Sequence, residues 1–379
     1  MMNVLVCGGF GFAGHYLVYK LLKEGNHIIL LGRSKGGLTI EERFEQLKAD
    51  NAKVNPTFKV DNVLFNNVTL ITADISKSNL GIAKNVFDQL IENGIAQIFN
   101  MAAYLRYEES YRAKVIDVNV KGTQNLLEIA QLTGAKLIHA STAYIADKNH
   151  KDFEPIKEEY CYANKFINVY IESKCKAELL IKNYAETNNI AFSIFRFPML
   201  VGDSQTGYTN SKFGVYEYIS ALIMVKKKAV ENEEIRVKAI SNGNLNLVPT
   251  DCVINGMLEI NKSIDSNKTI FNLTDEHPVS AIEIGEIFGK IYNLNFVVDD
   301  NFLEKNDLTD AERLFNRLTA RNNHFANKGY VFDSQNTNRI LGRPITSNWD
   351  KSISYFEKVV KGFTALNHRP TMAQAAKSE

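Results

Sequence analysis

A glycine-rich turn near the N-terminus constrains this chain more than any other feature. Gly8, Gly11 and Gly14 follow the short apolar run Val4–Cys7 and precede a helical pattern at His15–Glu24. This spacing suits a tight turn at Gly8, close approach of a pyrophosphate at Gly11, and close packing of helix against strand at Gly14. The amides at the start of the helix would then face the phosphates. The turn predicts a dinucleotide-binding βαβ unit, the alternative being a flexible loop that binds no ligand.

The first half of the chain alternates between short β-rich apolar runs and longer helical patterns. Such alternation is typical of a parallel sheet covered by helices on both faces. The fold class is therefore predicted to be α/β, with a doubly wound parallel Rossmann sheet. Residues 41–67 are interpreted as a polar surface insertion, with a short helix at 40–49. The predicted strands cover residues 4–7, 27–31, 68–73, 95–102, 136–140 and 191–197.

The pattern changes after Phe197, which indicates a second domain. Gly, Ser, Thr and Asn cluster at residues 202–212, and an apolar helical pattern follows at 215–224. We expect residues 1–205 to form the dinucleotide-binding domain, its sheet completed by parts of 236–275. Residues 206–366 are expected to form mainly a smaller α/β substrate-binding subdomain. The polar, alanine-rich residues 367–379 are predicted to be a disordered tail. Further predicted strands cover 244–248 and 269–273, and further helices 253–261 and 281–292.

The end of the second predicted strand bears on the choice of cofactor. Dinucleotide-binding proteins that prefer NAD usually place an acidic residue there, to bind the ribose hydroxyls. This chain instead has Arg33, with Lys35 nearby. A guanidinium can bind a 2'-phosphate through charge-assisted hydrogen bonds, so NADP(H) is favoured over NAD(H). The alternative is that Arg33 is a solvated loop cation.

Charge and cysteine content exclude several other classes of protein. The formal net charge is +1, so no overall field attracts nucleic acid or an acidic membrane. The four cysteines contain no Cys-x-x-Cys pair and the histidines show no ligand spacing, so no metal site is expected. The start lacks the pattern of a signal peptide, and no apolar stretch approaches the ~20 residues of a membrane-spanning helix. We therefore expect a cytoplasmic protein without stable membrane insertion.

A tyrosine and a lysine four residues apart are the candidate catalytic pair. Tyr170 and Lys174 lie on one face of a predicted helix at 165–184. An adjacent ammonium would favour the phenolate and bring the phenol toward neutral pH. The same spacing recurs at Tyr19, Tyr144 and Tyr208, so position must choose among the pairs. Only Tyr170 and Lys174 lie on a long helix that follows a strand ending in hydroxyl residues. These residues are Ser141 and Thr142, and one of them could stabilise a developing alkoxide.

The segments around this pair resemble the extended short-chain dehydrogenase/reductases, especially their thioester reductase and fatty acyl-CoA reductase branch. The similarity is carried by FINVYIESKCKAE at 166–178, HASTAY at 139–144 and RFPMLVGDS at 196–204. VPTD at 248–251 and the later Phe332-Asp333 and Asn336-Thr337 agree with it in order. Cys7 and Phe10 depart from the residues usual around the first glycines of that family.

The resemblance implies roles for individual residues. Thr142, or Ser141, would polarise the substrate carbonyl, Tyr170 would supply the proton, and Lys174 would hold the nicotinamide ribose. Tyr104, Tyr107, Asp203 and Thr206 are candidates for contact with substrate. The residues expected to bind the cofactor are Gly8, Phe10, Gly11, Phe12, Gly14, Arg33, Asp74, Ile75, Ala102, Ala103, Asn119, Lys174, Pro198 and Met199.

The same resemblance implies a reductase that transfers hydride from NADPH to a carbonyl. The favoured substrate is an acyl thioester on coenzyme A or on an acyl carrier protein supplied in trans, with a ketone or aldehyde as the other option. One alternative is a NAD-dependent nucleotide-sugar epimerase or dehydratase, although Thr142 is followed by Ala143 and Tyr144 instead of acidic residues. A third is a non-catalytic NADP-binding scaffold. The acyl chain, the extent of reduction and the oligomeric state stay undefined at this level.

Overall fold

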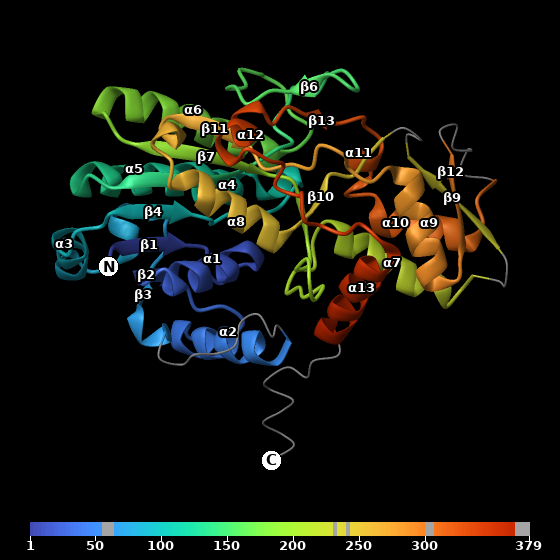
Figure 1. The fold of residues 1–379 in the computed structure, drawn as a ribbon, viewed down its shortest axis with the longest axis horizontal. Coiled ribbons are helices and arrows are strands. Elements are labelled where there is room, and N and C mark those ends of the chain that lie inside the picture. Colours follow the sequence, from blue (N-terminus) through green and yellow to red (C-terminus); the bar gives the residue numbers. More distant parts are fainter. Residues whose placement is uncertain (55–63, 230–232, 240–242, 300–306, 368–379) are drawn as a thin grey trace, which may run out of the picture. The chain divides into compact units, whose positions relative to one another are not determined.

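The computed structural model describes residues 1–54, 64–229, 233–239, 243–299 and 307–367 (Figure 1). They form two compact units, each built from separate stretches of chain. The first unit comprises Met1–Pro198, Asp251–Glu276 and Tyr330–Ser347, and the second comprises Met199–Thr250, His277–Gly329 and the residues from Asn348 onward. The predicted tail lies, from residue 368, outside the described residues.

A seven-stranded parallel sheet forms the centre of the first unit, as the alternating pattern predicted. Its strand order is β11-β7-β5-β4-β1-β2-β3, which Figure 1 shows from top to bottom. The order reverses between β1 and β4, and ligands bind at such a point, beyond the carboxyl ends of the strands. The bounds are β1 Asn3–Cys7, β2 His27–Gly32, β3 Val68–Thr72, β4 Gln97–Asn100, β5 Lys136–Thr142, β7 Phe192–Phe197 and β11 Thr269–Asn272.

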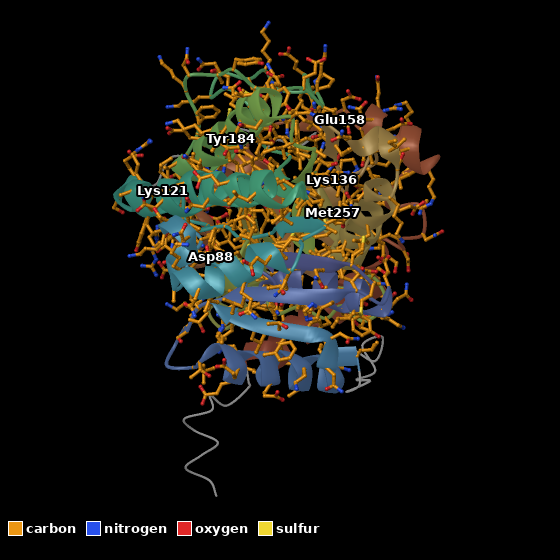
Figure 2. The ribbon with its side chains drawn as sticks, turned by 90° about the vertical axis from the view of Figure 1, so that its left-hand side faces the viewer. Asp88, Lys121, Lys136, Glu158, Tyr184 and Met257 are labelled. Carbon is orange, nitrogen blue, oxygen red and sulfur yellow. The ribbon has the colours of Figure 1, made fainter. Side chains whose placement is uncertain are left out.

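Helices cover both faces of this sheet, which explains why its strands are almost continuously apolar. Leu5 and Cys7 of β1 pack on one face with Leu90, Leu126 and Ile181, from α3 (Lys84–Glu92), α5 (Gly122–Thr133) and α6 (Val169–Asn188). In Figure 2, Asp88 and Tyr184 mark α3 and α6, and Lys121 marks the turn that continues into α5. Helix α1 (Phe12–Lys23) contacts β2 on the other face.

Most predicted elements are present, with shifted ends. The helix predicted at 40–49 is longer, as α2 (Ile40–Val54), and the strand predicted at 95–102 is shorter, as β4. The strand predicted at 244–248 becomes β10 (Leu247–Pro249), which pairs with β8 (Met199–Val201) outside the large sheet. Helix α8 (Thr250–Asn261) precedes β11, which completes the edge of the large sheet.

A late stretch of chain returns to the first unit, which the sequence did not reveal. Strand β13 (Val331–Phe332) pairs with β6 (Pro155–Ile156), and α12 (Gln335–Leu341) contacts β11. Glu158 joins these parts because its buried carboxylate accepts hydrogen bonds from the Asn272 amide at 2.8 Å, the Thr337 hydroxyl at 2.9 Å and the Asn336 amide. The segment after β6 is therefore fixed to residues that follow far along the chain.

The second unit combines a small parallel sheet with helices. Strand β9 (Glu234–Lys238) pairs with β12 (Asn295–Asp299), and Arg236 of β9 forms an ion pair with the buried Glu312 at 2.7 Å. Ser280–Glu283 and Thr309–Glu312 form capping boxes at two of its helices. The helices are α7 Val215–Lys226, α9 Ala281–Tyr292, α10 Asp310–Thr319, α11 Asn323–Ala326 and α13 Ile353–Asn367. In the described part of the chain, no helix has the length and apolar character for crossing a membrane.

Candidate active site

A cleft of about 330 Å³ opens in the first unit at the carboxyl ends of β1, β2 and β4. This is the edge at which a doubly wound sheet binds its ligand. The cleft brings together the glycine turn, the end of β2 and the segments after β3 and β4. Of the residues predicted to bind the cofactor, it is lined by Gly8, Phe10, Gly11, Arg33, Asp74, Ile75, Ala102 and Ala103.

The backbone of the glycine turn lies close to neighbouring backbone atoms. Gly8 has a φ of +84°, and a Cβ there would lie 2.6 Å from the Ala102 amide nitrogen. A Cβ on Gly14 would lie 2.1 Å from the Gly8 carbonyl oxygen, so these two positions leave no room for a side chain. At Gly11, which precedes α1 and its first residue Phe12, the nearest atom among the described residues would be 3.1 Å away. The turn is thus closed behind Gly8 and Gly14, and the backbone of Gly11 lines the cleft.

Two arginines lie at the β2 end of the cleft, and only one of them was predicted. Arg33 pairs with Asp74, its Nη1 lying 3.5 Å from the Asp74 Oδ2. Arg43, from α2, donates a hydrogen bond to the Arg33 carbonyl oxygen, and its guanidinium lies 4.4 Å from the centre of the Phe10 ring. Residues 41–67 are therefore more than a surface insertion, since their first helix supplies a cation to the cleft. Its position ten residues after Arg33, on the next predicted helix, was the available signal.

Asp74 is held in its ionised form at this end of the cleft. Burial opposes ionisation, but hydrogen bonds from the Ser76 hydroxyl at 2.7 Å and amide at 3.0 Å outweigh it. Together with the charge of Arg33, they lower the pKa of the Asp74 carboxyl. The carboxylate therefore keeps Arg33 at the mouth of the cleft.

Lys174 connects helix α6 to the end of strand β5. Its buried Nζ donates a hydrogen bond to the Ala140 carbonyl oxygen at 2.7 Å. Burial lowers the pKa of Lys174 to about 8, against an opposing effect of the Glu178 charge. The helix begins at Val169, because the Asn168 side chain accepts a hydrogen bond from the Ile171 amide at 2.9 Å, and not at 165 as predicted. This start places Tyr170 and Lys174 in the first two turns.

Tyr170 is half-buried, and its ring centre lies 6.1 Å from that of Tyr107. Burial raises the pKa of Tyr170, the opposite direction from that expected of a neighbouring ammonium. At neutral pH the Tyr170 phenol is therefore protonated and can act as an acid.

The hydroxyl residues at the end of β5 are both buried. The Ser141 Oγ has no hydrogen-bond partner among the described residues. The Thr142 Oγ1 accepts a long hydrogen bond of 3.4 Å from the Tyr144 amide. A buried hydroxyl without a partner costs free energy, so Ser141 has a donor to offer a ligand.

Asn119 does not line the cleft but contacts two segments next to it. It lies in a π-helical turn, Asp117–Lys121, between α4 (Arg112–Ile116) and α5. Its Oδ1 accepts from the Tyr104 amide at 2.8 Å, and its Nδ2 donates to the Ser173 Oγ at 2.9 Å. The Ser173 hydroxyl in turn donates to the Tyr170 carbonyl oxygen at 2.7 Å. Asn119 therefore links the segment after β4 to the start of α6.

The remaining candidates lie at or beyond the boundary between the units. Pro198 ends the first stretch of the first unit, and Met199 begins the second unit. In the second unit, the Asp203 carboxylate accepts hydrogen bonds from the Thr206 amide at 2.8 Å and hydroxyl at 2.9 Å. These two residues therefore stabilise their own turn. In the described residues, no group of three or more His, Cys, Asp or Glu side chains has an arrangement suited to a metal.

Comparison with known proteins relates these features to a family. The model of the family described as male sterility protein, an NAD-binding family, matches residues 6–257. Fatty acyl-CoA reductase 1 of Gallus gallus is 29% identical over 288 residues, which cover 67% of this chain and 53% of that protein. This chain thus spans about half the length of that relative.

Two solved structures are similar in fold. The terminal R domain from the myxalamid PKS-NRPS biosynthetic pathway superposes with a TM-score of 0.79 at 21% identity, covering 96% of this chain and 91% of that one. A thiolation-reductase di-domain from an archaeal non-ribosomal peptide synthetase gives a TM-score of 0.75 at 19% identity, covering 97% and 76%. At these identities the likeness concerns the fold alone.

Proposed function

The chain belongs to the male sterility protein family, in the fatty acyl-CoA reductase branch of the extended short-chain dehydrogenase/reductases, and on this premise we propose that it reduces acyl thioesters with NADPH. The thioester would be carried by coenzyme A or by an acyl carrier protein supplied in trans. The observation that carries the proposal is the bond from Lys174 to Ala140. It supports the proposal because it joins α6, which carries Tyr170, to β5, which ends in the hydroxyl residues.

The residues of the cleft fit a dinucleotide. The turn, whose Gly8 and Gly11 line the cleft, would receive the pyrophosphate, with Ile75 and Ala102 along the wall. When bound, the cofactor supplies the hydride. The cleft also contains two guanidinium groups, Arg33 and Arg43, which together suit a 2'-phosphate better than a neutral ribose hydroxyl. NADP(H) is therefore the cofactor that this charge distribution favours.

The chain's own residues can then protonate and hydrogen-bond the oxygen of the substrate carbonyl. As negative charge develops on that oxygen, Tyr170 donates the phenolic proton that burial retains at neutral pH. Ser141, whose hydroxyl has no partner in the described part of the chain, or Thr142 donates a second hydrogen bond to the same oxygen. Lys174 carries a positive charge below about pH 8, which holds the ribose and offsets the negative charge left on Tyr170.

The direct test measures NADPH oxidation with a panel of acyl-CoAs and acyl carrier thioesters of different chain length. The expected result is turnover with thioesters and none with the corresponding free acids. Aldehyde and alcohol products are quantified separately, which defines how far reduction proceeds. Turnover with ketones or aldehydes but with no thioester would contradict the substrate assignment and leave the reductase assignment standing.

A further inference from the structure

Two cysteines lie next to each other beside the candidate catalytic helix. Cys175, on α6, directly follows Lys174, and its Sγ lies 3.1 Å from the Cys161 carbonyl oxygen, to which it donates a hydrogen bond. The two side chains also interact electrostatically. Cys175 is buried and Cys161 is half-buried, so one sulfur is shielded and the other accessible. Neither has a part in the proposed reduction.

The segment that carries Cys161 is held against α6 by a buried ion pair. Arg196, on β7, pairs with Glu178 of α6 at 2.6 Å, and both side chains are about 1% exposed. The same guanidinium donates to the carbonyl oxygens of Lys157 at 2.9 Å and Glu159 at 2.7 Å. Arg196 therefore ties the residues just before Cys161 to helix α6. The tie is made at Glu178, one helical turn after Cys175.

The other side of this segment is fixed as well. Glu158, labelled in Figure 2, accepts hydrogen bonds from residues of β11 and α12, as described above. The contact between the Cys175 sulfur and the Cys161 backbone is thus imposed by surrounding structure and does not depend on the position of a free loop. The two cysteines therefore stay neighbours, which is the condition for forming a disulfide.

The surroundings also make the two thiols unequal. Interaction with the Cys175 thiol lowers the pKa of Cys161, and although burial opposes this, the Ala163 amide and the charge of Arg196 assist it. The pKa of Cys175 is raised, first by interaction with the Cys161 thiol and then by burial. The accessible cysteine therefore provides the thiolate, which is the reactive form, and the buried one keeps its proton.

We propose that Cys161 and Cys175 are a peroxide-sensitive redox pair, in which oxidation forms a reversible disulfide between segment 157–161 and helix α6. The Cys161 thiolate attacks one oxygen of hydrogen peroxide, the O–O bond breaks, and the leaving hydroxide takes up a proton to form water. Cys161 becomes a sulfenic acid. The Cys175 sulfur then attacks the Cys161 sulfur, the S–S bond forms, and hydroxide leaves with the Cys175 proton as a second water. Two thiols and one peroxide thus give one disulfide and two waters.

The test uses the reduced full chain, treated with hydrogen peroxide, then unfolded in urea and blocked with N-ethylmaleimide, and mapped by mass spectrometry after digestion. The expected product is a peptide pair joined through Cys161 and Cys175, two hydrogens lighter than the reduced form and restored by dithiothreitol. Cys7 and Cys252 should carry the maleimide. Detection of Cys161 as a free thiol, as sulfinic acid without the cross-link, or joined to another cysteine would overturn the proposal.

Substitutions separate the two steps. In Cys175→Ser the sulfenic acid at Cys161 cannot be resolved, so it should accumulate and be trapped by dimedone. The matched control Cys252→Ser, another half-buried cysteine, should form the cross-link as the wild type does. Cys161 should also react with iodoacetamide at pH 7 at least about threefold faster than the thiol of glutathione, because a lower pKa raises the thiolate fraction more than it reduces nucleophilicity. Equal alkylation rates, or no dimedone adduct in Cys175→Ser, would count against the redox pair.

Discussion

Burial acts in opposite senses on the two ionisable side chains of the candidate catalytic pair. It raises the pKa of Tyr170, which favours the neutral phenol, and lowers the pKa of Lys174, which favours the neutral amine. In both cases the uncharged form is favoured because charge is costly away from water. At the residue scale the site is therefore suited to giving a proton to a substrate, which is the direction that reduction requires.

Replacement of Tyr170 by Phe removes that proton and little else. We expect turnover with thioesters to fall by about 10²–10⁴-fold, the usual contribution of general acid catalysis. The affinity for NADPH, measured by fluorescence titration, should stay close to that of the wild type. Tyr184→Phe, on the same helix, is the matched control, and activity retained in Tyr170→Phe would refute the assigned role.

Replacement of Arg43 by Ala tests the residue that sequence reasoning missed. A charge-assisted hydrogen bond contributes about 1.5–3 kcal/mol, so the dissociation constant for NADPH should rise by roughly tenfold to a hundredfold. The constant for NADH should not change, since NADH has no 2'-phosphate. Arg339→Ala, an exposed arginine of the same unit, is the control. Equal weakening for both cofactors would indicate that Arg43 acts through the folding of α2.

The charge of Lys174 should make cofactor affinity depend on pH. The folded protein loses this proton near pH 8, whereas the unfolded chain keeps it up to an ordinary lysine value of ~10.4. Affinity should therefore fall as the pH rises through about 8, and the fall should be missing in Lys174→Met. In the same window the unfolded state binds more protons, so the lysine's contribution to the free energy of unfolding becomes more favourable with rising pH. Titrations from pH 6.5 to 10 would check both signs.

At the scale of elements, helix α6 has the largest number of roles. It carries Tyr170 and Lys174, is tied to the segment after β4 through Ser173 and Asn119, and is tied to β7 through Glu178. An element with these contacts determines the position of the reacting groups by its own packing. Substitutions on the buried side of α6 should therefore affect the candidate active site even where the substituted residue does not contact it.

Removal of the Glu178 carboxylate leaves Arg196 buried without its partner. Breaking such a pair typically costs about 3–5 kcal/mol, and the expected loss in the free energy of unfolding of Glu178→Ala is of that size. Urea denaturation measures it. Glu186→Ala, an exposed acid on the same helix, should change stability by less than about 0.5 kcal/mol. A small effect of Glu178→Ala would mean that water reaches Arg196.

The elements show how far sequence reasoning extends. Helix α9 was predicted with its observed bounds, and the structure shows a capping box at Ser280 where it begins. Strands β6 and β13 have two residues each, which is too short for any pattern, and they are defined by their pairing alone. The position of the Arg43 side chain in the cleft likewise depends on where α2 packs. The π-helical turn at Asn119 has no sequence signature. Long periodic elements and the residues at their ends could be predicted from the sequence. Contacts between segments that are far apart in the sequence could not.

At the scale of the whole molecule, binding of cofactor should be visible as a gain in stability. A ligand at a hundred times its dissociation constant stabilises the folded state by about 2.7 kcal/mol. We expect calorimetry to show that NADPH raises the unfolding temperature of the unit that contains the cleft, and that NADH at equal concentration raises it less. The double variant Arg33→Ala/Arg43→Ala should lose the difference between the cofactors. A larger shift with NADH would overturn the proposed cofactor preference.

The first unit is assembled from three separate stretches of chain, and this has a consequence for synthesis on the ribosome. Strand β7 ends at Phe197, but its neighbour β11 begins only at Thr269. At about 5–20 residues per second, β7 emerges roughly 4–14 s before β11 can cover its edge. An uncovered strand edge is a template for wrong pairing between chains. The nascent protein therefore has a period of several seconds in which a chaperone, or slower translation of residues 198–268, would decide its yield.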